Sequence, residues 1–150
     1  MFQVRLVRIA INNLTPFKEI CRKICLNIPA TYRWQWDTKR DMAQLTLSVE
    51  DAELAFFPLF KEFRHYWNFT SDAHAESAVA EIVNTKLGLM PGQTFFSSQT
   101  VSNLVLYAAW WPWGEDSKVS MRVGLISVNG MRLPPEAAFQ CLSRWLNISS

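Results

Sequence analysis

Histidine and carboxylate side chains are the first candidates for chemistry in this chain. His65 and His74 are the two histidines among 150 residues, and Glu76 lies close after His74. An imidazole with a nearby carboxylate is the usual equipment of a general base. No serine or cysteine nucleophile stands beside them in a recognisable motif. His65, His74 and Glu76 are therefore weak catalytic candidates, and the pattern favours a noncatalytic protein, with an enzyme as the alternative.

The three cysteines could bind a metal or carry out redox chemistry. Cys21 and Cys25 are spaced so that both thiols lie on one face of a helix, whereas Cys141 is distant in sequence. Structural zinc sites draw a full set of ligands from closely spaced pairs such as Cys-x-x-Cys, and the chain has no such pair. Because Cys21 and Cys25 fall on an apolar helical stripe, we predict that they pack in the core and form no metal site.

Phosphate-binding and hydrolase motifs are also missing from the sequence. Glycine is needed in such loops because the backbone must approach the phosphate closely. The chain has only five glycines and no Gly-x-Gly-x-x-Gly run, Walker loop or Gly-x-Ser-x-Gly elbow. We therefore expect no nucleotide or other cofactor.

Tryptophan is the unusual feature of the composition, with seven residues in the chain. Trp110 and Trp111 are adjacent on a predicted strand, so their side chains must point to opposite faces and cannot share one core. Trp113 follows a proline near a predicted turn. Exposed aromatic side chains line ligand pockets, stack on bases or anchor protein partners. The predicted binding residues are Trp110, Trp111, Trp113, Tyr66 and Trp67.

The first elements that must position these groups are a strand and a helix. Residues 2–11 are apolar and β-prone, which indicates an edge strand or a strand with a bulge. Thr15 followed by Pro16 predicts a helix start, with the Thr15 hydroxyl as the cap, and Pro29 follows its end.

A hairpin and a capped helix are predicted next. Period-two alternation indicates strands over 32–37 and 43–49, whose apolar side chains face one core. Trp34, Trp36 and Trp145 are expected in the core. Ser48 is predicted to cap the start of a helix. The apolar segment 54–69 should be helical, but its internal Pro58 should kink or split the helix.

The rest of the chain alternates helical and extended patterns. A glycine after an apolar helical stripe predicts a helix C-cap with a left-handed backbone. A run that is apolar on both faces predicts a central strand. The expected elements are a helix from Ser71 or Asp72 to Gly88, an ambiguous segment 94–101, strands 104–111 and 118–128, and a last helix that begins at Pro134-Pro135.

This element order favours an α+β fold. We predict an antiparallel or mixed sheet of five to six strands with about four helices packed mainly on one face. Residues 1–150 are expected to form a single globular domain, because no linker, repeat or low-complexity tract interrupts them. With 49% hydrophobic and 19% charged residues, the composition excludes a disordered chain.

Compartment and charge place further limits on partners. The odd number of cysteines and the lack of a visible signal peptide indicate a cytoplasmic protein, and the longest apolar stretch is too short for a membrane helix. Residues 1–40 hold eight Lys or Arg against two acidic residues, whereas the rest hold seven against eleven. Because the basic residues are scattered over several elements, a solvated surface is favoured over a binding patch.

Three functional hypotheses follow from the sequence. The first is a noncatalytic protein-interaction domain with an inhibitor, immunity-type or assembly role, which binds a protein partner or a second copy of itself through an aromatic surface. The second is a small-molecule-binding domain or enzyme with an aromatic-lined cleft. The third is a weak nucleic-acid binder that uses the basic N-terminal region, and we rank it last because no known nucleic-acid-binding motif accompanies the charge.

Overall fold

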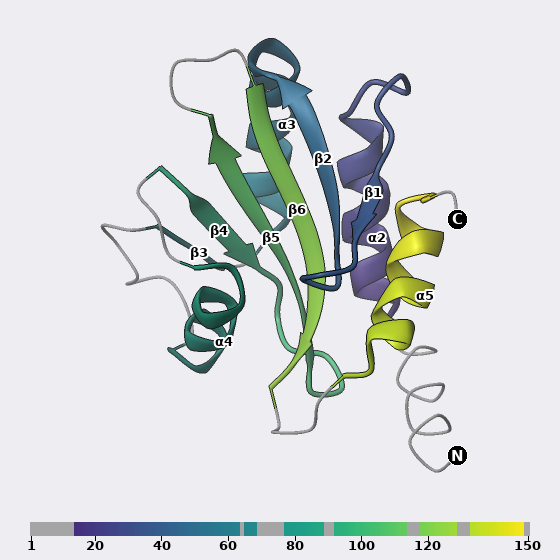
Figure 1. Ribbon diagram of the computed structural model, residues 1–150, viewed down its shortest axis with the longest axis vertical. Helices are drawn as coiled ribbons and strands as arrows, with labels where there is room; N and C mark the ends of the chain where they lie inside the picture. The colour runs from purple at the N-terminus through teal and green to yellow at the C-terminus, as the bar shows by residue number, and fades with distance from the viewer. Residues whose placement is uncertain are drawn as a thin grey trace.

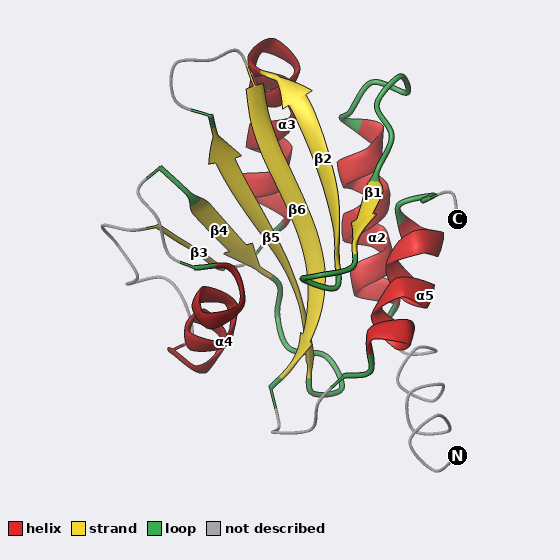
Figure 2. Ribbon diagram, viewed as in Figure 1, coloured by secondary structure: helices red, strands yellow, loops and turns green. Residues whose placement is uncertain are grey.

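Strands with alternating apolar and polar side chains build one antiparallel sheet in the computed structural model, which describes residues 14–63, 65–68, 77–88, 92–113, 118–128 and 133–148. The strands are β1 Gln35–Asp37, β2 Met42–Ser48, β3 His65–Asn68, β4 Thr94–Ser97, β5 Leu104–Pro112 and β6 Lys118–Ser127. Their order across the sheet is β1-β2-β6-β5-β4-β3, and every neighbouring pair is antiparallel (Figures 1 and 2). The two longest strands, β5 and β6, therefore lie at the centre.

Four helices accompany the sheet in the described part of the chain. They are α2 Thr15–Leu26, α3 Val49–Glu62, α4 Ser77–Leu87 and α5 Pro135–Trp145. The predicted α+β class is confirmed. None of these helices combines the length and the apolar character needed to cross a membrane.

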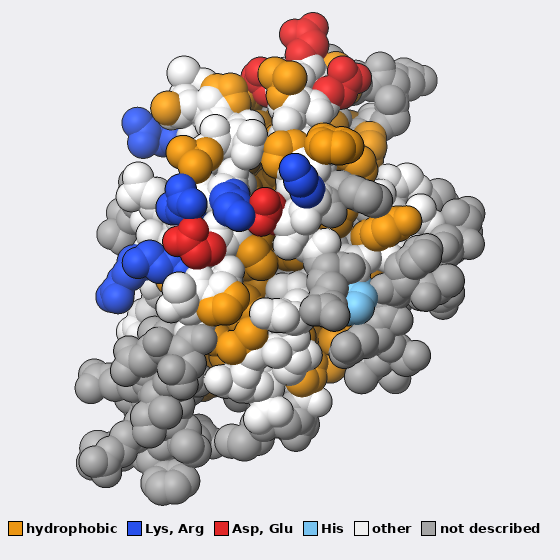
Figure 3. Space-filling view, turned by 180° about the vertical axis from the view of Figure 1, so that it is seen from behind, with side chains coloured by type: hydrophobic (Ala, Val, Ile, Leu, Met, Phe, Trp, Pro, Cys, Tyr) orange, Lys and Arg blue, Asp and Glu red, His pale blue; other side chains and the backbone are white. Residues whose placement is uncertain are grey.

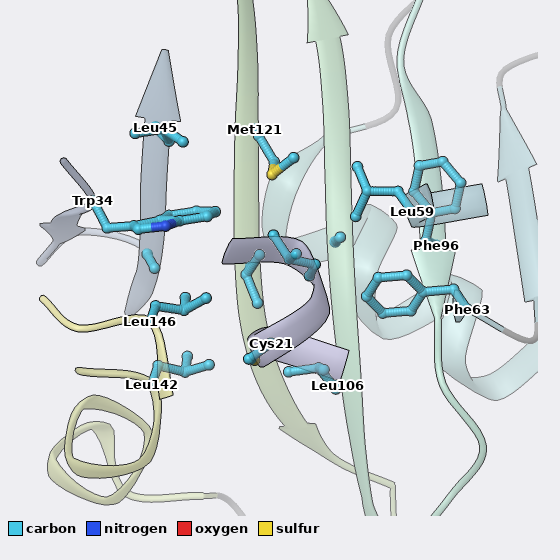
Figure 4. Close-up of a cluster of buried hydrophobic side chains, with 14 of the residues drawn as sticks. Cys21, Trp34, Leu45, Leu59, Phe63, Phe96, Leu106, Met121, Leu142 and Leu146 are labelled. Atoms are coloured by element: carbon cyan, nitrogen blue, oxygen red, sulfur yellow. The ribbon is translucent and has the colours of Figure 1, made fainter. Parts of the chain in front are cut away.

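The larger hydrophobic core, here called the helix-side core, lies between the sheet and helices α2, α3 and α5 (Figure 4). Side chains alternate along each strand, so that Leu106 of β5 and Met121 of β6 point into it. Each helix contributes one apolar stripe, which includes Cys21, Leu59 and Leu142. Full burial of one such aliphatic side chain stabilises the fold by about 1.5–3 kcal/mol.

A second core, here called the α4-side core, lies on the opposite face of the sheet. It joins Val79 and Val83 of α4 to Trp67 of β3, Phe95 of β4 and Tyr107 of β5. Figure 1 shows α4 next to β3 and β4, apart from the other three helices. Of the described helices, α2, α3 and α5 thus cover one face of the sheet and α4 packs against the other.

The prediction of a helix over residues 54–69 was wrong for its last part, because α3 ends at Glu62 and His65–Asn68 form strand β3. Of the two effects expected of Pro58, the split was wrong, since α3 runs through it as one helix. Proline removes the hydrogen bond to the carbonyl of Leu54, but Leu54 is 72% exposed, and water can bind that carbonyl. Pairing of β3 with β4 then places Trp67 in the α4-side core, which a helix could not do.

The predicted cap of α2 was also wrong. Thr15 is the first helical residue, the N-cap is Leu14, and no side chain caps this end. The side chain of Leu14 is buried in the helix-side core, and its backbone carbonyl accepts the N–H groups of Phe17 and Lys18 at 3.0 and 3.1 Å. Pro16 does lie in the first turn, where its missing N–H costs nothing.

Other local predictions are confirmed. The Ser48 hydroxyl accepts the N–H of Asp51 and caps α3, and Gly88 follows α4 with a φ of 78°. Strands β1 and β2 form the predicted hairpin, and Trp34 and Trp36 face the helix-side core. The strand expected at 2–11 and the expected helix start at 71–72 lie outside the described residues.

Candidate functional site

The five predicted binding residues occupy three different environments. Trp67 is fully buried in the α4-side core, and Trp110 is buried in the helix-side core. Tyr66 is half-buried against the helix-side core. Trp111 and Trp113 remain 36% and 48% exposed. The candidate surface therefore narrows to Trp111 and Trp113, which we call the tryptophan corner.

Strand alternation explains why the two exposed tryptophans share one side of the sheet. Trp110 points into the helix-side core, so Trp111 must point to the opposite face. Trp111 pairs with Ser120 of β6, and Trp113 lies just beyond the end of β5. As predicted, Trp110 and Trp111 do not serve the same core.

Three contacts fix the position of Trp113 although its side chain is exposed. The indole Nε1–H donates to the Ser120 hydroxyl at 2.6 Å, and the backbone N–H donates to the Lys118 carbonyl at 3.0 Å. The Lys118 ammonium lies 5.7 Å from the centre of the indole ring, within range of a cation–π interaction. A large aromatic side chain that is already ordered loses little conformational entropy when a partner covers it.

A hollow next to Trp111 is too small for an organic ligand. Its volume is about 30 Å³, and its lining includes Trp111, Ser120, Arg122, Arg40 and Gln93. That volume is comparable to the share of one water molecule in the liquid. Among the described residues, the hollow at the tryptophan corner therefore has no room for an organic ligand.

An ion-pair network lies beside the corner. Asp37 of β1 accepts hydrogen bonds from the guanidinium groups of Arg40 and Arg122, each at 3.2 Å. Burial alone would raise the pKa of Asp37, but the side-chain hydrogen bond from Arg40 and the backbone N–H groups of Arg40 and Lys39 outweigh it. The pKa of Asp37 therefore lies below its usual range, and Asp37 carries its charge at neutral pH.

Acid should destabilise this network by protonating Asp37. The folded-state pKa is depressed, so the contribution of Asp37 is present above its unfolded-chain pKa and is lost as the pH falls through the folded-state pKa. We expect Asp37→Asn to lower the free energy of unfolding by about 1–3 kcal/mol at neutral pH. The difference from wild type should shrink in acid. Urea denaturation at neutral pH and below pH 4 measures both values, and a difference independent of pH would contradict the assignment.

Glu19 provides the matched control for this prediction. It pairs with Arg22 at 2.9 Å, but both side chains are about half exposed on the surface of α2. Exposed ion pairs contribute little to stability because water and salt screen them. Glu19→Gln should leave the unfolding midpoint nearly unchanged at either pH.

The structure describes one of the three catalytic candidates, His65. His65 is half-buried on the edge strand β3, opposite Ser97 of β4. His74 and Glu76 lie outside the described residues. The described part of the chain contains no group of His, Cys, Asp and Glu residues that could hold a metal ion.

Cys21 and Cys25 pack against the helix-side core as predicted, and Cys141 is buried there as well. Burial raises the pKa of all three thiols, that of Cys141 to about 11. Thiolate is the reactive form of cysteine, so burial suppresses the reactivity of these side chains at neutral pH.

The described basic residues of the N-terminal region do not form one patch. On the face seen in Figure 3, Lys and Arg side chains are interspersed with acidic and hydrophobic ones. Lys23 pairs with Glu62 at 3.2 Å and Arg22 with Glu19, while Lys39 and Arg40 lie on the β1–β2 turn. This distribution agrees with a mixed solvated surface.

Sequence reasoning missed a second exposed apolar surface, which lies on α3. Leu54 and Phe57 are about 70% exposed on the outer face of α3, three residues apart. Ala52, Ala55 and Leu59 face the core instead. Helical periodicity distinguishes the exposed set from the buried set. It was not applied across this segment because Pro58 was expected to kink or split the helix.

Comparisons with known proteins leave the chain without an assigned family. No family model, no curated protein and no solved structure matches it.

Proposed function

We propose that this protein is a noncatalytic interaction domain that binds a protein partner, or a second copy of itself, through the tryptophan corner. The observation that supports this most strongly is the exposure of Trp111 and Trp113, the second of which is held in place by its hydrogen bond to Ser120. Tryptophan is among the residues that most often dominate binding energy at protein interfaces. An inhibitor, an immunity-type protein and an assembly factor all need such a surface. The three free, reduced thiols are consistent with a cytoplasmic role.

The small-molecule alternative has less support at this position. A binding site for a drug-sized molecule commonly occupies about 300–1,000 Å³. The hollow beside Trp111 offers about 30 Å³. Nucleic-acid binding through the N-terminal region ranks third, because the described cations there are mixed with acidic partners.

Removal of the exposed indoles should weaken association without unfolding the domain. We expect Trp111→Ala and Trp113→Ala each to weaken partner binding or self-association by about thirtyfold, which corresponds to about 2 kcal/mol. Native mass spectrometry of tagged protein purified from its own host identifies the complex, and titration of the recovered partner measures the affinity. Phe57→Ala removes an even more exposed aromatic side chain from α3 and is the matched control.

Each outcome of this experiment is informative. A multiple of 17.3 kDa indicates self-association, and a second polypeptide indicates a distinct partner. Unchanged affinity in both tryptophan variants would reject the tryptophan corner as the interface. A bound mass of a few hundred daltons in place of a polypeptide would favour the small-molecule alternative.

A further inference from the structure

A groove lies at one end of β6, beyond the last residue that pairs with a described part of β2. Pairing between β2 and β6 runs from Ser48 opposite Lys118 to Ala43 opposite Val123, but β6 continues to Ser127. Among the described strands, none pairs with this edge of β6 beyond Val123. A groove of about 510 Å³ is found here, which we call the β6-edge groove. Its volume falls in the range of binding sites.

Cationic side chains from two separate elements converge on the β6-edge groove. Lys39 and Arg40 come from the β1–β2 turn and Lys86 from α4, whereas Asp41 is the acidic residue in the lining. The Asp37 carboxylate accepts the backbone N–H groups of Lys39 and Arg40 at 2.9 and 3.2 Å, which fixes the turn that carries them. Arg40 is also paired with Asp37, but three cationic side chains against the one carboxylate of Asp41 leave the described lining with a net positive charge, which favours an acidic ligand.

The apolar part of the lining is aliphatic. It comprises Leu125 and Ile126 of β6, Ile82 of α4, and Leu133, Pro135 and Ala138 at the start of α5. The described lining includes no aromatic side chain on which a base could stack, and base stacking is the usual means of binding single-stranded nucleic acid. Branched aliphatic side chains of a ligand would fit this surface better.

The edge of β6 beyond Val123, with which no described strand pairs, favours a peptide over an alkyl anion. Strand edges expose backbone N–H and C=O groups, and covering them without hydrogen bonds is costly. An alkyl chain cannot pair with these groups, whereas an extended peptide satisfies them by strand addition. We propose that the β6-edge groove binds an extended segment of a partner protein that alternates acidic and aliphatic residues. This inference names the partner's chemistry and rests on the proposed function.

Selection from a phage-displayed library of random short peptides tests the proposal on the full chain. Enriched peptides should combine Asp or Glu with Val, Ile or Leu. Lys39→Glu/Lys86→Glu should weaken their binding by about tenfold or more, because it reverses the charge that faces the peptide. The control Lys18→Glu/Lys61→Glu changes two exposed lysines on α2 and α3 and should have little effect. Circular dichroism checks that both variants fold.

A chemical change in the peptide tests the strand pairing. Two adjacent central residues of the best peptide are N-methylated one at a time, because only alternate N–H groups of an added strand face β6. One of the two changes should weaken binding by about fivefold, in line with one lost hydrogen bond. Full binding by both methylated peptides would overturn the proposal. So would an absence of enrichment, enrichment of aromatic or basic sequences, or equal binding to the Lys39→Glu/Lys86→Glu variant. Binding of decanoate without binding of any peptide would likewise reject it in favour of a small anion.

The tryptophan variants separate this inference from the proposed function. Trp111→Ala/Trp113→Ala should retain the selected peptides while losing the partner from the host. If no peptide is selected but these variants still lose the partner, the groove proposal fails and the proposed function stands. If the partner depends on the groove lysines and not on the tryptophans, the tryptophan corner fails as the interface and the groove proposal stands.

Discussion

Gly124→Ala should lower the free energy of unfolding by about 3 kcal/mol, because it overpacks a tight contact at the centre of the sheet. Gly124 of β6 lies directly opposite Tyr107 of β5, and the ring of Tyr107 covers it. A methyl group at position 124 would lie 2.6 Å from ring carbon Cε1 and closer still to the hydroxyl end of the ring. Tyr107 is fully buried, so its ring has no free space into which to move. Urea denaturation followed by tryptophan fluorescence measures the change.

Tyr107→Phe tests the same contact from the other side. The Tyr107 hydroxyl is buried and has no hydrogen-bond partner among the described residues, and such a group costs about 1–3 kcal/mol. Burial also raises the pKa of Tyr107, so that the hydroxyl remains neutral. We expect Tyr107→Phe to be as stable as wild type or more stable by about 1 kcal/mol.

The double variant shows whether the two effects are coupled. The hydroxyl oxygen is the Tyr107 atom nearest to the place that a β-carbon of residue 124 would occupy, so its removal should relieve part of the clash. Gly124→Ala/Tyr107→Phe should therefore lose less stability than the sum of the single changes, by about 1 kcal/mol. Strict additivity, or a Gly124→Ala variant as stable as wild type, would contradict the close packing.

Trp67→Ala should have the other large effect, a loss of about 3–5 kcal/mol in the free energy of unfolding. Trp67 is fully buried and stacks on Phe95, with ring centres 5.3 Å apart and an interplanar angle of 23°. Its indole also belongs to the core that joins Val79 and Val83 of α4 to the sheet. Because α4 relies on this core, its amide hydrogens should also exchange faster in the variant.

Trp113→Ala is the control that separates a core tryptophan from a surface one. Trp113 is 48% exposed, and its replacement should cost less than about 1 kcal/mol. Trp67→Phe keeps an aromatic ring against Phe95 and should retain part of the lost stability. Equal destabilisation by Trp67→Ala and Trp113→Ala would show that the α4-side core is not packed as described.

Features encoded in a few neighbouring residues could be predicted from the sequence. Ser48 caps α3, Gly88 follows α4, and residues 32–49 contain a hairpin, because capping, left-handed backbone and period-two alternation depend on local chemistry. The opposite orientations of Trp110 and Trp111 follow from strand geometry in the same way. The α+β class follows from the order of such elements.

Features that depend on partners elsewhere in the chain could not be predicted in this way. Pro58 remains within α3 because core packing on one side of the helix outweighs a hydrogen bond lost on the exposed side. The burial of Trp67 depends on pairing with β4 and on α4, and the pairing of Asp37 with Arg122 joins residues 85 positions apart. The β6-edge groove exists because β2 and β6 differ in their end points, which only strand register decides. The sequence by itself determined the local elements and the supply of aromatic side chains, whereas tertiary packing decided which tryptophans remain exposed, because burial is a property of the surroundings and not of the residue type.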